Sequence, residues 1–282
     1  MRELLRRMDA WSGSRWKWTA LAAAGAAAAL AAAAVHGAVG SGAWPWAAPA
    51  AAAVAATAAA GGALLLYLQL QQLREAEQLR ALVNVRPLAG RLPLDLAGWA
   101  ADPVFADELV RHVGRRRPGL VVECGSGWTT VLAAACLEEL GRGRIVALEH
   151  LAPFAERTRR LLADAGLAHR AEVVTAPLED WRLADGSWRW YARDGVAAVE
   201  GPVDLLVVDG PPGRRVAGSR YPAVPVLADR LAPDACVLLD DGLRPGEERI
   251  ARAWGGRLGV EPVLDARGQG LWVLDLGADG TD

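Results

Sequence analysis

The chain has 282 residues, and its 31 lysines and arginines nearly balance its 33 aspartates and glutamates, for a formal net charge of −2. This balance gives no support for a nucleic acid as partner, because such a partner requires a basic surface. The three cysteines, Cys124, Cys136 and Cys236, lack the spacing of a metal site, and none of them requires a disulfide.

The N-terminal part is unusually apolar, since no Asp, Glu, Lys or Arg occurs between Lys17 and Arg74. It divides into two stretches, 18–39 and 47–68, and each has about the ~20 residues that cross a ~30 Å hydrocarbon core. The short connection between them is rich in glycine. The pattern predicts a transmembrane helical hairpin over residues 18–68, with the membrane as partner.

The positions of the cations predict the orientation of this hairpin. Residues 1–17 form a basic N-terminus, and further arginines follow the second stretch from Arg74 onward. Because positive charges stay on the cytoplasmic side, we expect a multi-pass protein of the cell membrane with both ends in the cytoplasm. Two alternatives stay open, a cleaved signal peptide and a soluble alanine-rich helix.

A helical stalk is predicted over residues 69–86, ending at Pro87. Its leucines are spaced along one helical face at Leu70, Leu73, Leu79 and Leu82. Such a face can pair two copies in a homodimer or pack on the chain's own domain. Further on, Asp102 followed by a proline predicts an N-cap and a helix toward Val113.

The most informative segment is Val121–Thr130, an apolar strand that runs into a glycine-rich turn. A dinucleotide site needs a third Gly or Ala where this chain has Thr130. Glu123 would repel a pyrophosphate, but it can accept a hydrogen bond from an ammonium group. A second strand, 144–149, ends at Glu149, whose carboxylate suits the two hydroxyls of a ribose. Ribose together with an amino acid indicates S-adenosylmethionine.

With these motifs, residues 120–276 resemble the class I S-adenosylmethionine-dependent methyltransferases. The resemblance implies an α/β fold, Rossmann-like and doubly wound, for a domain at residues 87–282. It implies that the methionine end of the cofactor contacts Glu123, Gly125, Ser126 and Gly127, and the ribose Glu149. The adenine is expected beside Ala176 and Leu178, which follow a third strand at 171–175. Alternating strand and helix patterns from Leu120 onward independently predict a mainly parallel sheet with helices on both faces.

Two later strands, 203–209 and 236–241, both end in carboxylates. Neighbouring parallel strands lie ~4.8 Å apart, so Asp209, Asp240 and Asp241 are expected to converge. Three carboxylates suit Mg²⁺, as in the similar metal-dependent catechol O-methyltransferases. That group usually has Asn in place of Asp241, however, and the turn after Asp209 looks more like methyltransferases that act on sugar hydroxyls.

Without a metal, Asp209 or Asp240 is the expected general base and Asp241 an N-cap of the next helix. Arg220 and Arg244, in nearby loops, then either hold an anionic acceptor or pair with these carboxylates. The sequence thus predicts a membrane-anchored methyltransferase that O-methylates a hydroxyl of a small molecule, a lipid-linked intermediate or a glycan. The alternative is a non-catalytic, membrane-tethered sensor or assembly protein that binds S-adenosylmethionine.

Overall fold

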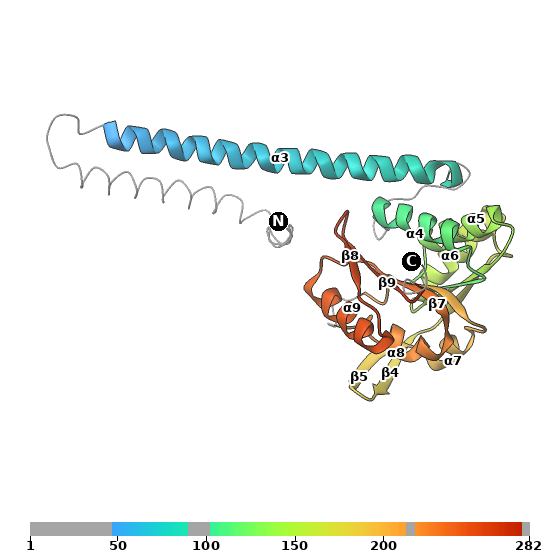
Figure 1. Ribbon diagram of the computed structural model, residues 1–282. Helices are drawn as coiled ribbons and strands as arrows, with labels where there is room; N and C mark the ends of the chain where they lie inside the picture. Colours follow the sequence, from blue (N-terminus) through green and yellow to red (C-terminus); the bar gives the residue numbers. More distant parts are fainter. Residues whose placement is uncertain (1–46, 90–101, 213–217, 278–282) are drawn as a thin grey trace. The chain divides into compact units, whose positions relative to one another are not determined.

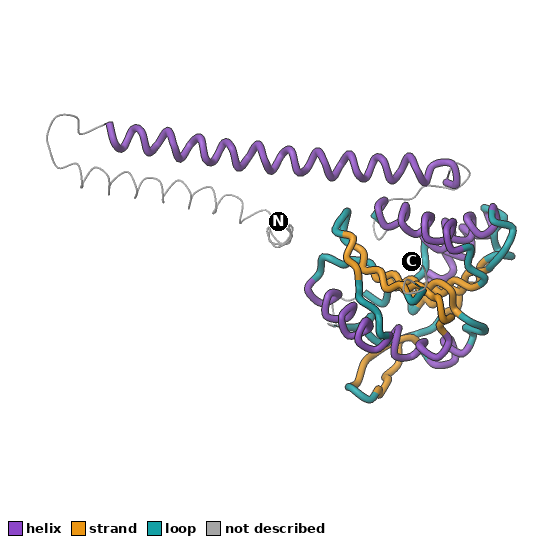
Figure 2. Tube along the Cα trace, viewed as in Figure 1, coloured by secondary structure: helices purple, strands orange, loops and turns teal. Residues whose placement is uncertain are grey.

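The computed structural model describes residues 47–89, 102–212 and 218–277, shown as ribbon and tube in Figures 1 and 2. The chain divides into two compact units, Met1–Glu75 and Ala76–Asp282. The described part of the first unit is the beginning of α3 (Ala47–Ala89), in which Leu64, Leu65, Leu66 and Leu68 are exposed.

The predicted transmembrane hairpin falls partly on α3. The second stretch, 47–68, is helical and runs without interruption into the stalk, while the first, 18–39, lies outside the described residues. Within the described ranges, no helix combines the length and the hydropathy that crossing a membrane requires.

The stalk contacts the chain's own domain chiefly through Ala81 and Val85, while two of the four predicted leucines, Leu70 and Leu82, are partly buried. Leu73 and Leu79 are more than half exposed, whereas Ala81 and Val85 are buried. Val85 packs in a small cluster with Trp128 and other apolar residues of the domain. Pro87 also does not end the helix, which continues for two more residues to Ala89.

A seven-stranded sheet with the strand order β3-β2-β1-β6-β7-β9-β8 forms the centre of the second unit. The strands β1 to β7 of this sheet are parallel, and β9 and β8 are antiparallel additions at one edge. The prediction of a Rossmann-like, mainly parallel sheet is therefore confirmed. The strands are β1 (Leu120–Cys124), β2 (Arg144–Glu149), β3 (Ala171–Thr175), β6 (Val203–Val208), β7 (Leu231–Leu239), β8 (Val263–Asp265) and β9 (Leu271–Asp275).

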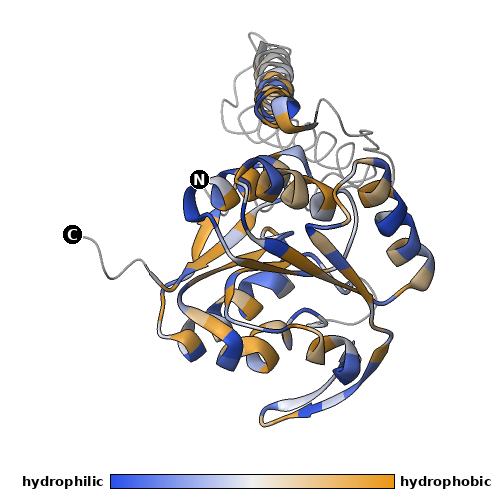
Figure 3. Ribbon diagram, turned by 90° about the vertical axis from the view of Figure 1, so that its right-hand side faces the viewer, coloured by the Kyte–Doolittle hydropathy of each residue, from blue (hydrophilic) through white to orange (hydrophobic). Residues whose placement is uncertain are grey.

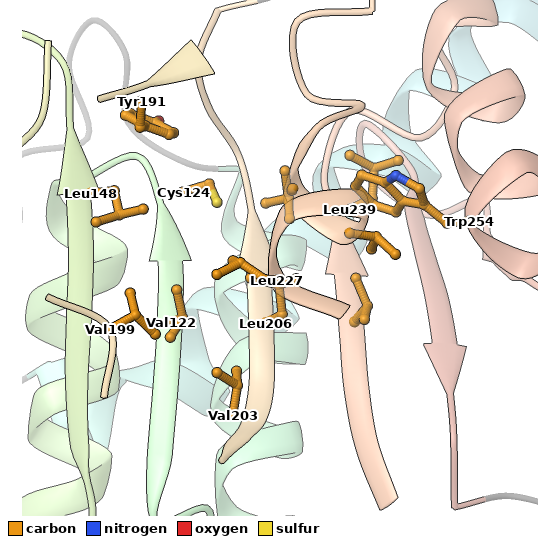
Figure 4. Close-up of a cluster of buried hydrophobic side chains, with 14 of the residues drawn as sticks. Val122, Cys124, Leu148, Tyr191, Val199, Val203, Leu206, Leu227, Leu239 and Trp254 are labelled. Carbon is orange, nitrogen blue, oxygen red and sulfur yellow. The ribbon is translucent and has the colours of Figure 1, made fainter. Parts of the chain in front are cut away.

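Helices cover both faces of the sheet, whose central strands are mostly apolar in the hydropathy colouring (Figure 3). All residues of β1 and all but one of β6 are buried, as expected of strands that are covered on both faces. On one face, Val121 and Leu205 pack in a core with apolar residues of the first three helices of the domain. On the other face, Val122, Leu206 and Trp254 belong to a second core (Figure 4). The helices are α4 (Pro103–Arg116), α5 (Trp128–Glu139) and α6 (Ala152–Asp164) on the first face, with α7 (Arg193–Ala197), α8 (Ala223–Leu227) and α9 (Pro245–Leu258) contributing to the second core; a 3-10 turn, η1 (Ala228–Arg230), follows α8.

A β-hairpin of β4 (Leu178–Leu183) and β5 (Gly186–Tyr191) is inserted between β3 and β6, and it projects from the domain in Figure 1. Its base is part of the core, since Trp190 and Tyr191 are completely buried. Farther out, the rings of Trp188 and Tyr221 lie 4.9 Å apart between centroids. The hairpin is thus joined both to the core and to the segment before α8.

Candidate active site

A cavity of about 420 Å³ opens at the carboxyl ends of the parallel strands. It lies where β1 separates β2 from β6, so that the strand order runs outward in opposite directions from this point. Such a point in an open α/β sheet is the usual place of a ligand. The residues that line the cavity include Glu123, Gly125, Ser126, Gly127, Glu149, Asp209, Asp240 and Asp241.

The turn after β1 has the shape that its glycines predict. Gly125 has a φ of +113°, in a region that side chains with a Cβ rarely adopt. The turn after β1 lies against the turn after β6, since a Cβ at Gly125 would make an ordinary contact, 3.6 Å, with the backbone nitrogen of Gly210. Gly127 is the N-cap of α5, which begins on the cavity. The start of this helix therefore presents backbone N–H groups to a ligand.

Glu123, at the end of β1, is almost completely buried. Its carboxylate accepts hydrogen bonds from the hydroxyls of Thr129 and Thr130, the latter at 2.6 Å. Burial raises the pKa of Glu123 to about 7, although both hydroxyls oppose the rise. A carboxylate has about four lone-pair sites, so two remain for a cationic ligand.

Glu149, at the end of β2, is buried and held by neighbouring groups. The backbone N–H of Leu151 donates to it at 2.9 Å, and the Ser126 hydroxyl donates at 3.2 Å. His150 places its Nδ1 3.0 Å from the same carboxylate. The glycine-rich turn and the second acidic strand end are therefore joined directly through Ser126.

The three aspartates after β6 and β7 also come together. One carboxylate oxygen from each of Asp209, Asp240 and Asp241 lies within 4.8 Å of the others. Asp241 has a left-handed backbone, with φ of +60°. Its side chain does not cap α9, whose N-cap is Arg244, but forms ion pairs with Arg220 at 2.8 Å and with Arg244. The two arginines therefore pair with the carboxylates.

Arg220 is the most buried charged group of this cluster, with 3% of its side chain exposed. Besides Asp241, its guanidinium donates to the carbonyl of Asp240 at 2.9 Å and to the carbonyl and carboxylate of Asp209 at 2.7 and 3.0 Å. The Asp209 side chain is 29% exposed and lines the cavity. The Asp209 carboxylate is thus held by the buried Arg220 guanidinium and remains accessible to a ligand in the cavity.

Burial raises the pKa of both Asp209 and Asp240. The Asp241 carboxylate raises both further and Asp209 raises the pKa of Asp240, whereas the side-chain hydrogen bond between Asp209 and Asp240 lowers the pKa of Asp209. Arg220 opposes the rise at both, and the rise is larger for Asp240, whose pKa lies well above its ordinary value. The pair therefore retains a proton on Asp240 more readily than on Asp209.

Two predicted cofactor residues are not among those that line the cavity. Ala176 is completely buried in the core, and Leu178 begins β4 and packs against the same core. Sequence analysis missed Leu151 and Phe154, which line the cavity beside Glu149 and are 44% and 38% exposed. Their position three residues apart, at the start of the helix after Glu149, was the available signal.

Residues from distant parts of the chain complete the cavity. Asp102 is the predicted N-cap of α4, with its carboxylate accepting from Val104 N at 2.9 Å, and it also accepts from Gln269 N at 2.7 Å. Tyr191 is completely buried, and its ring meets that of His150 edge to face. Trp128 lines the cavity and at the same time packs in the core with Val85.

The fold and the carboxylates at these strand ends are those expected of a class I methyltransferase. Residues 122–242 match the model of a family described as a methyltransferase domain. This match confirms the assignment to the S-adenosylmethionine-dependent methyltransferases made from the sequence. A comparison with curated proteins gave no match.

Several solved structures are similar to this chain. The O-methyltransferase TomG from Streptomyces achromogenes, involved in tomaymycin synthesis and solved with SAM, is 20% identical, with 69% of this chain and 88% of that chain covered and a TM-score of 0.47. An O-methyltransferase from Bacillus cereus with SAH is 18% identical, with coverages of 70% and 90% and a TM-score of 0.47. A methyltransferase from Pyrococcus furiosus is 18% identical, with coverages of 72% and 98% and a TM-score of 0.48.

Proposed function

We propose that this protein transfers a methyl group from S-adenosylmethionine to a hydroxyl group of a small molecule, a lipid-linked intermediate or a glycan. The observation that carries the proposal is that one cavity contains both kinds of site. The turn after β1, with Glu123 and Glu149, lines it together with the carboxylates of Asp209 and Asp240.

The cofactor side of the cavity fits the chemical groups of S-adenosylmethionine. Glu123 can accept from its ammonium group, and the free N–H groups at the start of α5 can donate to its carboxylate. Glu149 is positioned for the ribose hydroxyls, while Leu151 and Phe154 offer apolar surface to the adenine. When bound, the cofactor supplies an electrophilic methyl group.

The aspartates supply the base for the acceptor. Asp209 faces the cavity and is paired with Arg220, so it is the ionised member that can take the proton of a hydroxyl. Asp240 is the member that stays protonated, because burial and two neighbouring carboxylates raise its pKa. General-base assistance of this kind contributes about 10²- to 10⁴-fold, in addition to the rate gained by alignment of the reactants.

The Mg²⁺ ion that the sequence allowed does not fit the cluster as it is built. Mg²⁺ requires oxygen ligands in near-octahedral arrangement. Here N–H donors of Arg220 are directed at Asp209 and Asp241, two of its three candidate ligands. Proton transfer is therefore assigned to the aspartates alone.

We also propose that the chain is attached to a membrane through residues 18–68 and that its domain faces the cytoplasm. The support is the charge pattern of the sequence, since the described helix adds none. The test is extraction of membranes with alkaline carbonate from cells that make the full chain. Recovery in the pellet supports the proposal, and release into the supernatant contradicts it.

The cofactor is tested first, by calorimetric titration of the full chain with S-adenosylmethionine. We expect saturable binding that Glu149→Ala weakens by about tenfold or more, because hydrogen bonds to a charged group contribute ~1.5 to 3 kcal/mol. Glu172→Ala is the matched control, since Glu172 is an exposed carboxylate on β3 with a partner at 3.7 Å. Absence of binding by the folded wild-type chain would overturn the proposed function.

A further inference from the structure

Arg220 contacts each of the three aspartates of the cluster, two of them at the carboxylate and Asp240 at the backbone carbonyl. One of its terminal nitrogens, Nη2, lies 3.0 Å from Asp209 Oδ1, 2.7 Å from Asp209 O and 2.8 Å from Asp241 Oδ2. The other, Nη1, donates to Asp240 O at 2.9 Å. A single guanidinium thus contacts all three aspartates that follow β6 and β7.

Two features of this arrangement oppose a divalent cation. One carboxylate oxygen of Asp209 and one of Asp241 already receive N–H groups of Arg220, so fewer lone pairs remain for a metal. A cation placed among the three carboxylates would also lie beside a buried positive charge, where the Coulomb repulsion is strong. Arg244 adds a second positive charge at Asp241.

The surrounding loop fixes Arg220 in this position. Ser219, the preceding residue, is buried and donates from its hydroxyl to the carbonyl of Pro211 at 3.0 Å. The following residue, Tyr221, donates its N–H to Gly218 O at 2.9 Å and accepts at its own carbonyl from the Trp254 ring N–H at 2.8 Å. The arginine is therefore held on both sides by backbone contacts that do not depend on its charge.

We propose that Arg220 is a built-in replacement for a metal ion: it positions Asp209 toward the acceptor hydroxyl, so that methyl transfer needs no divalent cation. This inference rests on the proposed function of the site. It makes Arg220 a positioning residue that acts through Asp209. It also predicts that removal of the guanidinium leaves a carboxylate cluster able to bind a metal.

The test is a titration of the full chain with Mn²⁺, followed by the electron paramagnetic resonance signal of the free ion. We expect no saturable binding at the cluster in the wild-type chain. Arg220→Met should tighten Mn²⁺ binding by about tenfold or more, since ligand carboxylates are then uncompensated. Arg220→Lys retains a cation and should show no such gain.

Two variants serve as controls. Arg230→Met removes another arginine, one that donates to the carbonyls of Val196 and Val199 at 2.7 and 2.6 Å, and it should not change Mn²⁺ binding. Adding Asp209→Asn to Arg220→Met should abolish the gain. The proposal is overturned if the wild-type chain binds Mn²⁺ at a site that Asp209→Asn removes, or if folded Arg220→Met shows no gain.

Binding of S-adenosylmethionine, measured on the same samples, separates this inference from the proposed function. If the wild-type chain binds both the cofactor and Mn²⁺ at the cluster, the proposed function stands and the proposal about Arg220 is wrong. If the folded wild-type chain does not bind the cofactor, the proposed function is wrong. Because the wild-type titration and Asp209→Asn need no change at Arg220, the proposal stays testable even if Arg220→Met does not fold.

Discussion

The two sides of the cavity hold their carboxylates in different ways. Glu123 and Glu149, after β1 and β2, accept from threonine and serine hydroxyls and from a backbone N–H, with the His150 ring beside Glu149. Asp209 and Asp241, after β6 and β7, are paired with guanidinium groups.

This difference in the partners of the carboxylates determines what each side of the cavity can bind. Hydroxyl and amide donors orient a carboxylate without cancelling its charge, so the first side stays suited to a ligand that carries an ammonium group and ribose hydroxyls. Guanidinium groups cancel the charge, so the second side has no need of a further cation. Its remaining capacity is to accept a proton from a neutral acceptor.

The largest expected effect is on the second side. Asp209→Asn should lower turnover by about 10²- to 10⁴-fold, because an amide cannot act as the base, while the affinity for S-adenosylmethionine stays within about twofold. The measurement pairs a methyl-transfer assay, after an acceptor has been found by screening, with calorimetry. Asp229→Asn, at an exposed position after α8, is the control. An equal loss of turnover and of cofactor affinity would contradict the proposal that Asp209 acts on the acceptor and not in cofactor binding.

The next effect concerns stability on the first side. The pKa of Glu123 is raised from 4.5 to about 7 in the folded protein, mainly by burial. Its contribution to stability is therefore fully present below about pH 4.5 and is lost as the pH rises through about 7. The neutral and nearly isosteric Glu123→Gln does not lose this contribution.

Relative to the wild-type chain, Glu123→Gln should gain on the order of 3 kcal/mol in unfolding free energy between pH 5 and pH 8, from a shift of about 1.36 kcal/mol per pKa unit. Urea unfolding at both pH values measures the difference. Glu172→Gln, which changes an exposed carboxylate of β3, is the control. A constant difference between wild type and Glu123→Gln would mean that Glu123 titrates like an exposed carboxylate.

How much of this arrangement was predictable depends on the range of the interactions. The strands at 120–124, 144–149 and 171–175 follow from local apolar runs, and the conformation of Gly125 follows from its turn. The convergence of three aspartates was predictable because parallel strands end at one edge. For Arg220 the sequence left two roles open, to hold an acceptor or to pair with the carboxylates, because its partners depend on how the segment before α8 packs against the ends of β6 and β7.

The smallest expected effect lies where the second side meets α4. Asp102 caps this helix and also accepts from the backbone N–H of Gln269, in the loop before β9. Asp102→Ala should cost about 1 to 2 kcal/mol of unfolding free energy, the usual range for loss of an N-cap. Asp102→Asn keeps an acceptor oxygen and should recover most of it, as urea unfolding would measure. Asp102 lines the cavity, but its hydrogen bonds go to Val104 and Gln269 and not to Glu123 or Glu149, the carboxylates assigned to the cofactor. The affinity for S-adenosylmethionine should therefore not change in either variant. A loss of affinity as large as that expected for Glu149→Ala would instead mean that Asp102 contributes to cofactor binding, and the division of the cavity proposed here would be wrong at this position.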